Sequence, residues 1–250
     1  MDTKNNLTIF HIHRKDGTSL FLHPFSDSQF LITLNNSYTI KGLYGNEPRV
    51  ESLTMFRNDL YRLIESAVKS WMNDIRFIPR FIISSAAFLL IYLVASFVIR
   101  DPIPLIDELV LSFAGGIAVY IIMSRKDQNS EKSAKKRLDL RLLMDKIVFE
   151  EDEFVKEVEE ILHYHESIDN ISIINSLAES NDNSFINSKP DDIKQLISYL
   201  DKYFSGRNYR KKIENLNNQE KDKLSKWAKD NKIDLSLFAM YKKLLKRIPK

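Results

Sequence analysis

The pattern of apolar and polar residues changes most sharply in the middle of the chain. Phe81–Ile99 contains no charged residue, and Ile103–Met123 is apolar apart from two acidic residues near its start. Only three residues separate the two segments. A helix needs about 20 mostly apolar residues to cross the ~30 Å hydrocarbon core of a bilayer, and each segment is that long. The pattern therefore predicts a two-pass transmembrane hairpin over residues 79–124.

The alternative is a helical hairpin buried inside a soluble domain. The first segment is apolar on all sides, and a helix of that kind must be buried in protein or in lipid. Burying two such helices in protein requires a large surrounding core, whereas the flanking sequence is charged and rich in Lys, Asn and Ser. The membrane is therefore the expected surrounding.

Basic residues set the expected orientation, because cytoplasmic loops carry an excess of Lys and Arg. Basic residues lie before the first segment and after the second, but the turn carries only Arg100. We expect an integral two-pass protein with both the N- and C-termini in the cytoplasm. The basic residues after the second segment should contact anionic lipid headgroups, at about 1 kcal/mol each near the surface; they include Arg125, Lys126, Lys135, Lys136 and Arg137.

Upstream of the hairpin, residues 1–48 alternate in a way that is typical of strands. Asp16-Gly17 between two β-rich runs is a strong hairpin signal. The pattern predicts a four-stranded antiparallel β-meander, with Leu7–Arg14, Ser19–Phe25, Gln29–Leu34 and Tyr38–Leu43 as strands. One face would carry Phe10, Ile12, Leu20, Leu22, Phe30 and Ile32. Residues 50–77 have apolar residues every three or four positions, which predicts an amphipathic helix that caps the sheet and leads to the membrane. The alternative is that this helix lies flat on the bilayer.

Downstream of the hairpin, three further segments are expected. Residues 125–168 are basic and then acidic, and their apolar spacing of four and three predicts a coiled-coil helix that Glu151 could divide in two. Residues 169–189 read as a linker that could contain one short helix. Residues 190–250 predict a basic bundle of short amphipathic helices, although the last helix could instead lie on the bilayer surface. The predicted fold class is thus an α+β membrane protein, with a small sheet, a hairpin, a coiled-coil stalk and a C-terminal helical bundle.

Two groups of residues in the hairpin are candidate sites. Asp107 and Glu108 lie less than two turns into the second segment, where acidic residues are costly and so are functional candidates. They could line an ion path, or form a structural pair with Arg100 that the helix dipole also favours. Small residues let transmembrane helices approach closely; those in the second segment include Ser112, Gly115, Gly116 and Ala118.

The sequence gives little sign of catalysis. It has no cysteine, six scattered glycines and five histidines. His11 and His13 share one face of a strand, but no third metal ligand can be identified. We expect no metal, no cofactor and no enzymatic activity. The formal net charge is only +3, so we expect no nucleic acid partner.

Two functions fit these expectations. The first is a membrane-anchored, oligomeric scaffold or adaptor that presents soluble modules to protein partners. The alternative is an oligomeric ion channel or pore with Asp107 and Glu108 at its outer mouth. In outline this layout looks like that of the mitochondrial calcium uniporter family. The Trp-Asp-x-x-Glu-Pro element of that family is absent, however, so membership does not follow.

Overall fold

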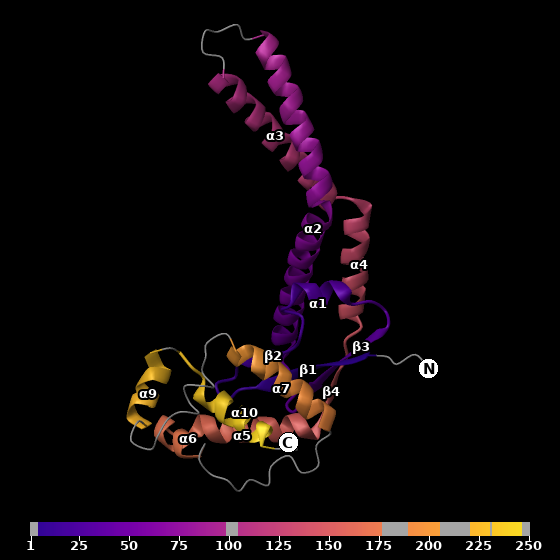
Figure 1. Ribbon diagram of the computed structural model, residues 1–250. Helices are drawn as coiled ribbons and strands as arrows, with labels where there is room; N and C mark the ends of the chain where they lie inside the picture. The colour runs from indigo at the N-terminus through magenta and orange to yellow at the C-terminus, as the bar shows by residue number, and fades with distance from the viewer. Residues whose placement is uncertain (1–4, 99–104, 177–189, 206–220, 231, 247–250) are drawn as a thin grey trace. The chain divides into compact units, whose positions relative to one another are not determined.

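The computed structural model describes residues 5–98, 105–176, 190–205, 221–230 and 232–246 (Figure 1). The chain forms two compact units. Unit 1 comprises Met1–Pro24, Asn36–Asn58 and Lys146–Lys250, and unit 2 comprises Phe25–Asn35 and Asp59–Asp145. One long helix, α2 (Val50–Val98), contributes to both units.

Unit 1 is built on a mixed four-stranded sheet with the strand order β2-β1-β3-β4. Its strands are β1 (Asn5–His13), β2 (Ser19–Leu22), β3 (Tyr38–Tyr44) and β4 (Phe149–Glu151). β1 and β2 are antiparallel and are joined by a turn in which Gly17 has φ +83°, a conformation that favours glycine. β3 runs parallel to β1, and β4 runs parallel to β3.

The predicted antiparallel meander is therefore wrong beyond its first hairpin. The third predicted strand is the helix α1 (Ser28–Thr33). Asp27 caps this helix, because its carboxylate accepts hydrogen bonds from Gln29 N at 2.9 Å and Phe30 N at 3.3 Å. β2 and α1 form the connection between the parallel strands β1 and β3. The fourth strand comes from beyond the apolar hairpin, so residues 1–48 do not complete the sheet.

Helices from the C-terminal half of the chain cover one face of this sheet. They are α5 (Glu153–Ser167), α7 (Pro190–Ser205) and α10 (Leu235–Leu245). Phe10, Ile12 and Leu22 share a buried apolar cluster with residues of all three helices, and Leu20 packs against it. The predicted common face is thus correct for these four residues and wrong for Phe30 and Ile32, which lie in α1.

The other face of the sheet meets the beginning of α2. Successive side chains of a strand point to opposite faces, so Phe21 is directed away from the Leu22 cluster. Its ring stacks on Phe56 at a centroid distance of 4.2 Å and an interplanar angle of 8°. Phe149 of β4 meets Phe56 edge-on at 6.4 Å. The first turns of α2 therefore cap this face of the sheet.

The C-terminal helices do not form the separate bundle that the sequence predicted. The short helix α6 (Asn170–Ser176) lies within the predicted linker, and with α9 (Lys221–Asp230) and α10 it forms a second apolar cluster. Phe238, Met240, Tyr241 and Leu244 of α10 are buried in the main cluster. This burial favours packing of α10 in protein over an interfacial position on a bilayer.

Unit 2 contains the apolar hairpin together with α1 and α4. α3 (Leu105–Gln128) returns beside the second half of α2 (Figure 1), and α4 (Glu131–Asp145) follows it. Residues 125–168 are thus divided among α3, α4, β4 and α5, and not a single coiled-coil helix. Arg137 Nε and Arg141 Nη2 of α4 lie 2.8 and 2.7 Å from the Glu65 carboxylate of α2. Pro79 lies inside α2, which passes through the predicted boundary at 77–79 without a break.

α2 and α3 are both long and apolar enough to cross a membrane by length and composition. Only 6% of the apolar window of α2 and 11% of that of α3 is buried within the structure. Large apolar side chains of the hairpin are correspondingly exposed; they include Ile82, Leu90, Phe97, Ile106 and Val110.

Candidate functional site

The two acidic residues of the hairpin lie in different surroundings. Glu108, in the first turn of α3, is only 3% exposed, whereas Asp107 is exposed. The Glu108 carboxylate accepts a hydrogen bond from Ser96 Oγ of α2 at 3.0 Å. One turn further on, buried Ser112 donates its hydroxyl to the Glu108 carbonyl oxygen at 2.6 Å. Glu108 therefore links the two apolar helices. Arg100, the predicted partner, lies outside the described residues.

Three of the four predicted packing residues face the first helix of the hairpin. Ser112 is fully buried. A Cβ atom on Gly115 would lie 2.2 Å from Ile91 Cδ1, and one on Gly116 would lie 3.3 Å from the Ser84 carbonyl oxygen. A larger residue at Gly116 would crowd the backbone of α2, whereas one at Gly115 would displace the end of the Ile91 side chain. Ala118 is exposed and takes no part in this contact.

Arg80, a buried arginine of α2, connects α2 to the last turns of α3, here called the base of the hairpin. The sequence analysis did not identify this residue as a site. Arg80 is only 1% exposed. Its Nε donates to Asp127 Oδ2 of α3 at 2.7 Å, and its Nη1 donates to Asn73 Oδ1 at 2.9 Å and to Ser124 Oγ at 3.3 Å. Asn73 and Arg80 are seven residues apart, which places them on one face of a helix. That spacing was a usable signal, but the pairing with Asp127 crosses 47 residues.

The basic residues predicted to contact lipid divide into two groups. Arg125, Lys126 and Lys135 are exposed. Lys136 donates to the Leu34 carbonyl oxygen at 3.1 Å, and burial lowers the pKa of its ammonium group although Asp139 acts in the opposite direction. Arg137 is engaged by Glu65 and by the Gln128 carbonyl oxygen. Only the first group presents exposed charges.

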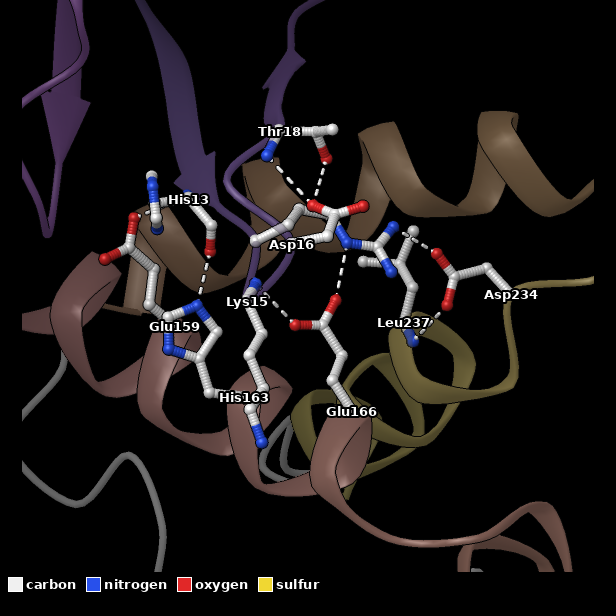
Figure 2. A network of polar contacts seen from close by, with 10 residues as sticks. His13, Lys15, Asp16, Thr18, Glu159, His163, Glu166, Asp234 and Leu237 are labelled. Atoms are coloured by element: carbon white, nitrogen blue, oxygen red, sulfur yellow. Dashed lines mark hydrogen bonds and ion pairs between the residues drawn. The ribbon is translucent and has the colours of Figure 1, made fainter.

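In unit 1, a polar network joins the end of β1 to α5 and α10 (Figure 2). The Glu159 carboxylate, on a residue only 1% exposed, accepts from His13 N at 2.7 Å and from Asn46 Nδ2 at 2.5 Å. Burial raises the pKa of this carboxyl group. His163 Nε2 donates to the His13 carbonyl oxygen at 2.8 Å, so α5 satisfies both backbone groups of His13.

The neighbouring arginine extends this network. Arg14 Nε lies 2.5 Å from Glu166 Oε1, and its Nη1 donates to Asp234 (Figure 2). Asp234 also caps α10, because it accepts from Leu237 N at 3.0 Å. The carboxylates of Glu159, Glu166 and Asp234 thus accept from backbone N–H groups, from the Asn46 amide and from Arg14. This is the arrangement of a structural link between the sheet and its covering helices.

The histidine pair considered as a metal site is divided between two sets of contacts. His11 is buried, its Nε2 lies 3.0 Å from Ser19 Oγ, and burial, followed by the nearby His13, lowers its pKa to about 4. His13 lies against His163 with a ring-centroid distance of 6.0 Å. Among the described residues, no group of three or more His, Cys, Asp or Glu side chains could hold a metal ion.

Comparisons with protein-family models, with curated proteins and with solved structures gave no match.

Proposed function

We propose that this chain is a two-pass membrane anchor that holds unit 1 at the cytoplasmic face of a membrane, where unit 1 serves as an adaptor for protein partners. The observation that carries this proposal is the exposed apolar surface of the hairpin. Phe97 is 81% exposed, Ile106 67% and Leu90 64%. Covering such a side chain is worth about 1.5–3 kcal/mol, so water is a poor surrounding for this surface.

If the hairpin belonged to the core of a soluble domain, most of its apolar residues would be buried. The core helix of a soluble protein has most of its apolar residues covered, but here 6% and 11% of the two apolar windows are buried. Lipid tails would cover the remaining surface. They would also leave the contacts between α2 and α3, made by Ser96, Glu108 and Gly115, inside the hairpin.

Oligomerisation is part of this proposal. Ala114 and Ala118 are exposed one turn apart on α3, on a face that the hairpin itself does not use. In lipid, faces with small residues favour close helix contacts between subunits. A homo-oligomer would present several copies of unit 1 side by side.

Membrane integration and orientation are tested together by cysteine labelling, which the cysteine-free chain makes simple. Single variants Glu47→Cys, Arg100→Cys and Lys229→Cys are expressed in cells and treated with a membrane-impermeant maleimide. We expect Arg100→Cys to react in intact cells and the other two only after permeabilisation. Release of the protein by alkaline carbonate would contradict membrane integration, and labelling of Lys229→Cys in intact cells would contradict the orientation.

The alternative function, an ion channel, is favoured by one observation: a carboxylate, Glu108, is buried among apolar helices. The purified chain in vesicles is assayed for cation flux, together with Glu108→Gln and Asp107→Asn. The adaptor predicts no flux above empty vesicles. Flux that Glu108→Gln reduces would support the channel and remove the adaptor as the primary function.

A further inference from the structure

The strand β4 forms one edge of the unit 1 sheet, because its neighbour in the strand order is β3 alone. The Val148 carbonyl oxygen accepts from Gly42 N at 3.0 Å, and Asp152 N donates to the last residue of β3 at 2.8 Å. The backbone groups of successive residues in a strand alternate between its two sides. The N–H and C=O groups of Phe149 and Glu151 therefore point away from β3, toward the outside of the sheet.

These outward groups have no partner within the described part of the chain. None of the hydrogen bonds between described residues involves the backbone of Phe149 or Glu151. Each of the two residues therefore offers one backbone donor and one backbone acceptor. Nearby side chains are also uncovered, since Val148 is 66% exposed and Glu150 and Glu151 are exposed. An open strand edge of this kind is a template for an added strand.

The charge along the β4 edge selects which strand it accepts. Residues 147–155 contain four acidic residues and no basic residue. Among the described residues, Glu150 and Glu151 form no ion pair. As consecutive residues of a strand, they project to opposite faces of the sheet. A strand added beside β4 meets one carboxylate on each face, so two consecutive Lys or Arg residues complement both.

The same two carboxylates disfavour other occupants of the β4 edge. A second copy of β4 would bring its own glutamates beside them, and like charges on paired strands are destabilising. Charged residues on an edge strand protect a sheet against such self-pairing. They do not act against a strand of opposite charge, whereas nucleic acid and anionic lipid would be repelled.

We infer that the β4 edge binds an extended segment of a partner protein that carries two consecutive basic residues, and that the segment adds to the sheet as a fifth strand. The partner backbone pairs with Phe149 and Glu151, and its basic side chains lie opposite Glu150 and Glu151. The inference rests on the proposed adaptor function and deepens it, because it names the binding surface and the class of partner.

The test measures binding of a fluorescent peptide, Lys-Lys-Val-Val-Lys-Lys, to the full chain in uncharged detergent by fluorescence anisotropy. The same peptide with Glu in place of Lys should bind about tenfold more weakly. Two further versions carry N-methyl groups on the odd or on the even positions. Strand pairing uses the N–H groups of only one set, so their affinities should differ by about tenfold, the effect of one or two lost hydrogen bonds. Equal affinities would show attraction by charge alone and would overturn the inference.

Variants of β4 locate the site. Glu151→Pro removes the outward N–H and leaves the bonds to β3 in place, at an edge position where strands tolerate proline. It should weaken peptide binding more than Glu151→Gln, which removes the same charge and keeps the N–H. Glu150→Lys with Glu151→Lys should reverse the preference, so that the Glu peptide binds better. Glu160→Lys, at an exposed position on α5, is the control and should not reverse it.

An unchanged preference in the double lysine variant would overturn the inference. So would a smaller oligomer for Glu151→Pro than for the wild type in sedimentation, because this result would assign the β4 edge to a second copy of the chain. Membrane anchoring would survive each of these results, since carbonate extraction tests it separately. A chain that carbonate releases would remove the anchoring and still report whether the β4 edge binds the peptide.

Discussion

At the scale of single residues, Arg80 and Glu159 show how each unit compensates a buried charged group. Arg80 is 1% exposed in unit 2 and depends on Asp127 for charge balance. Glu159 is equally buried in unit 1, where neutral N–H donors from His13 and Asn46 compensate it. Removing one partner of a buried charge is much more destabilising than removing an exposed charge, because the remaining charge is left unpaired.

This asymmetry predicts unequal effects at the base of the hairpin. Asp127→Asn should destabilise the chain by about 3 kcal/mol, because the Arg80 charge stays buried without its counterion. Arg80→Leu should be milder, since Asp127 is 19% exposed and Arg76 Nε lies 3.9 Å from it. Unfolding in detergent micelles, followed by circular dichroism, measures both. The exposed pair Arg62–Asp59 provides the control, and Arg62→Gln should change stability by less than about 1 kcal/mol. Equal effects of Asp127→Asn and Arg62→Gln would contradict the buried ion pair.

Two histidines with lowered pKa values, His11 and His23, predict that acid destabilises unit 1. Burial lowers the pKa of His11 and of His23 to about 4, from 6.5 in the unfolded chain. Folding therefore favours the neutral rings, so their contribution is complete above pH 6.5 and is lost as the pH falls from 6.5 toward 4. The raised pKa of Glu159 acts in the opposite direction, because its protonation favours the fold.

At pH 5.5, His11 alone should reduce the unfolding free energy by about 1.4 kcal/mol relative to pH 7.5. This pH is one unit below the pKa of His11 in the unfolded chain, and each such unit corresponds to about 1.4 kcal/mol. Thermal unfolding of the wild type and of His11→Gln at the two pH values checks this. The variant should show a smaller drop between them. A drop of the same size in both proteins would show that His11 does not bind the proton on unfolding.

At the scale of elements, local signals in the sequence predicted the helices better than the strands. The apolar spacing and Asp234 cap of α10 and the one-sided spacing of α7 were readable because the groups that stabilise a helix lie within a few residues of one another. Gln29–Leu34 alternates like a strand, and only the Asp27 cap indicates α1. β4 has three residues, and nothing local shows that it pairs with β3, more than 100 residues earlier.

The candidate sites were likewise predictable only where their residues lie close together in the sequence. Placing Glu108, Ser112 and Gly116 on one helix required only their spacing, but deciding which of Asp107 and Glu108 is buried required the position of Ser96 on the other helix. The Arg80–Asp127 pair and the Glu159 network each join segments distant in sequence. Single-sequence patterns carry no information on such pairings.

Helix capping at α5 gives a test at this scale. The Asp152 carboxylate accepts from Phe154 N at 3.0 Å and from Val155 N at 3.4 Å, immediately after β4. Asp152→Ala should therefore cost about 1 kcal/mol of unfolding free energy. Glu160→Ala, an exposed position on the same helix, should change it by less than about 0.5 kcal/mol. Equal effects in urea unfolding would mean that the cap contributes nothing.

At the scale of the whole molecule, unit 1 is assembled from segments on both sides of the apolar hairpin. Its main apolar cluster combines Phe10 and Ile12 of β1 with Val158, Leu196 and Leu237 of the C-terminal helices. The sheet takes β4 from the same distant region. The N-terminal strands therefore depend on segments that follow the hairpin in the sequence. In the proposed membrane anchor, this dependence couples the folding of unit 1 to insertion of the hairpin.

Removal of residues 190–250 tests this dependence. The truncated chain keeps the hairpin, so it should still resist carbonate extraction, but it loses α7 and α10 from above Phe10 and Ile12. Uncovering several large apolar residues removes more free energy than a small domain can spare. Trypsin should then cut after Arg14 or Lys15 at least tenfold faster than in the full chain. The control is a full chain with a specific protease site inserted within 177–189 and cut after folding. Its C-terminal fragment should stay bound, because apolar packing and the Arg14–Asp234 ion pair hold it, and Arg14 should remain protected. Equal protection of Arg14 in the truncated chain would show instead that residues 1–48 fold as an independent domain.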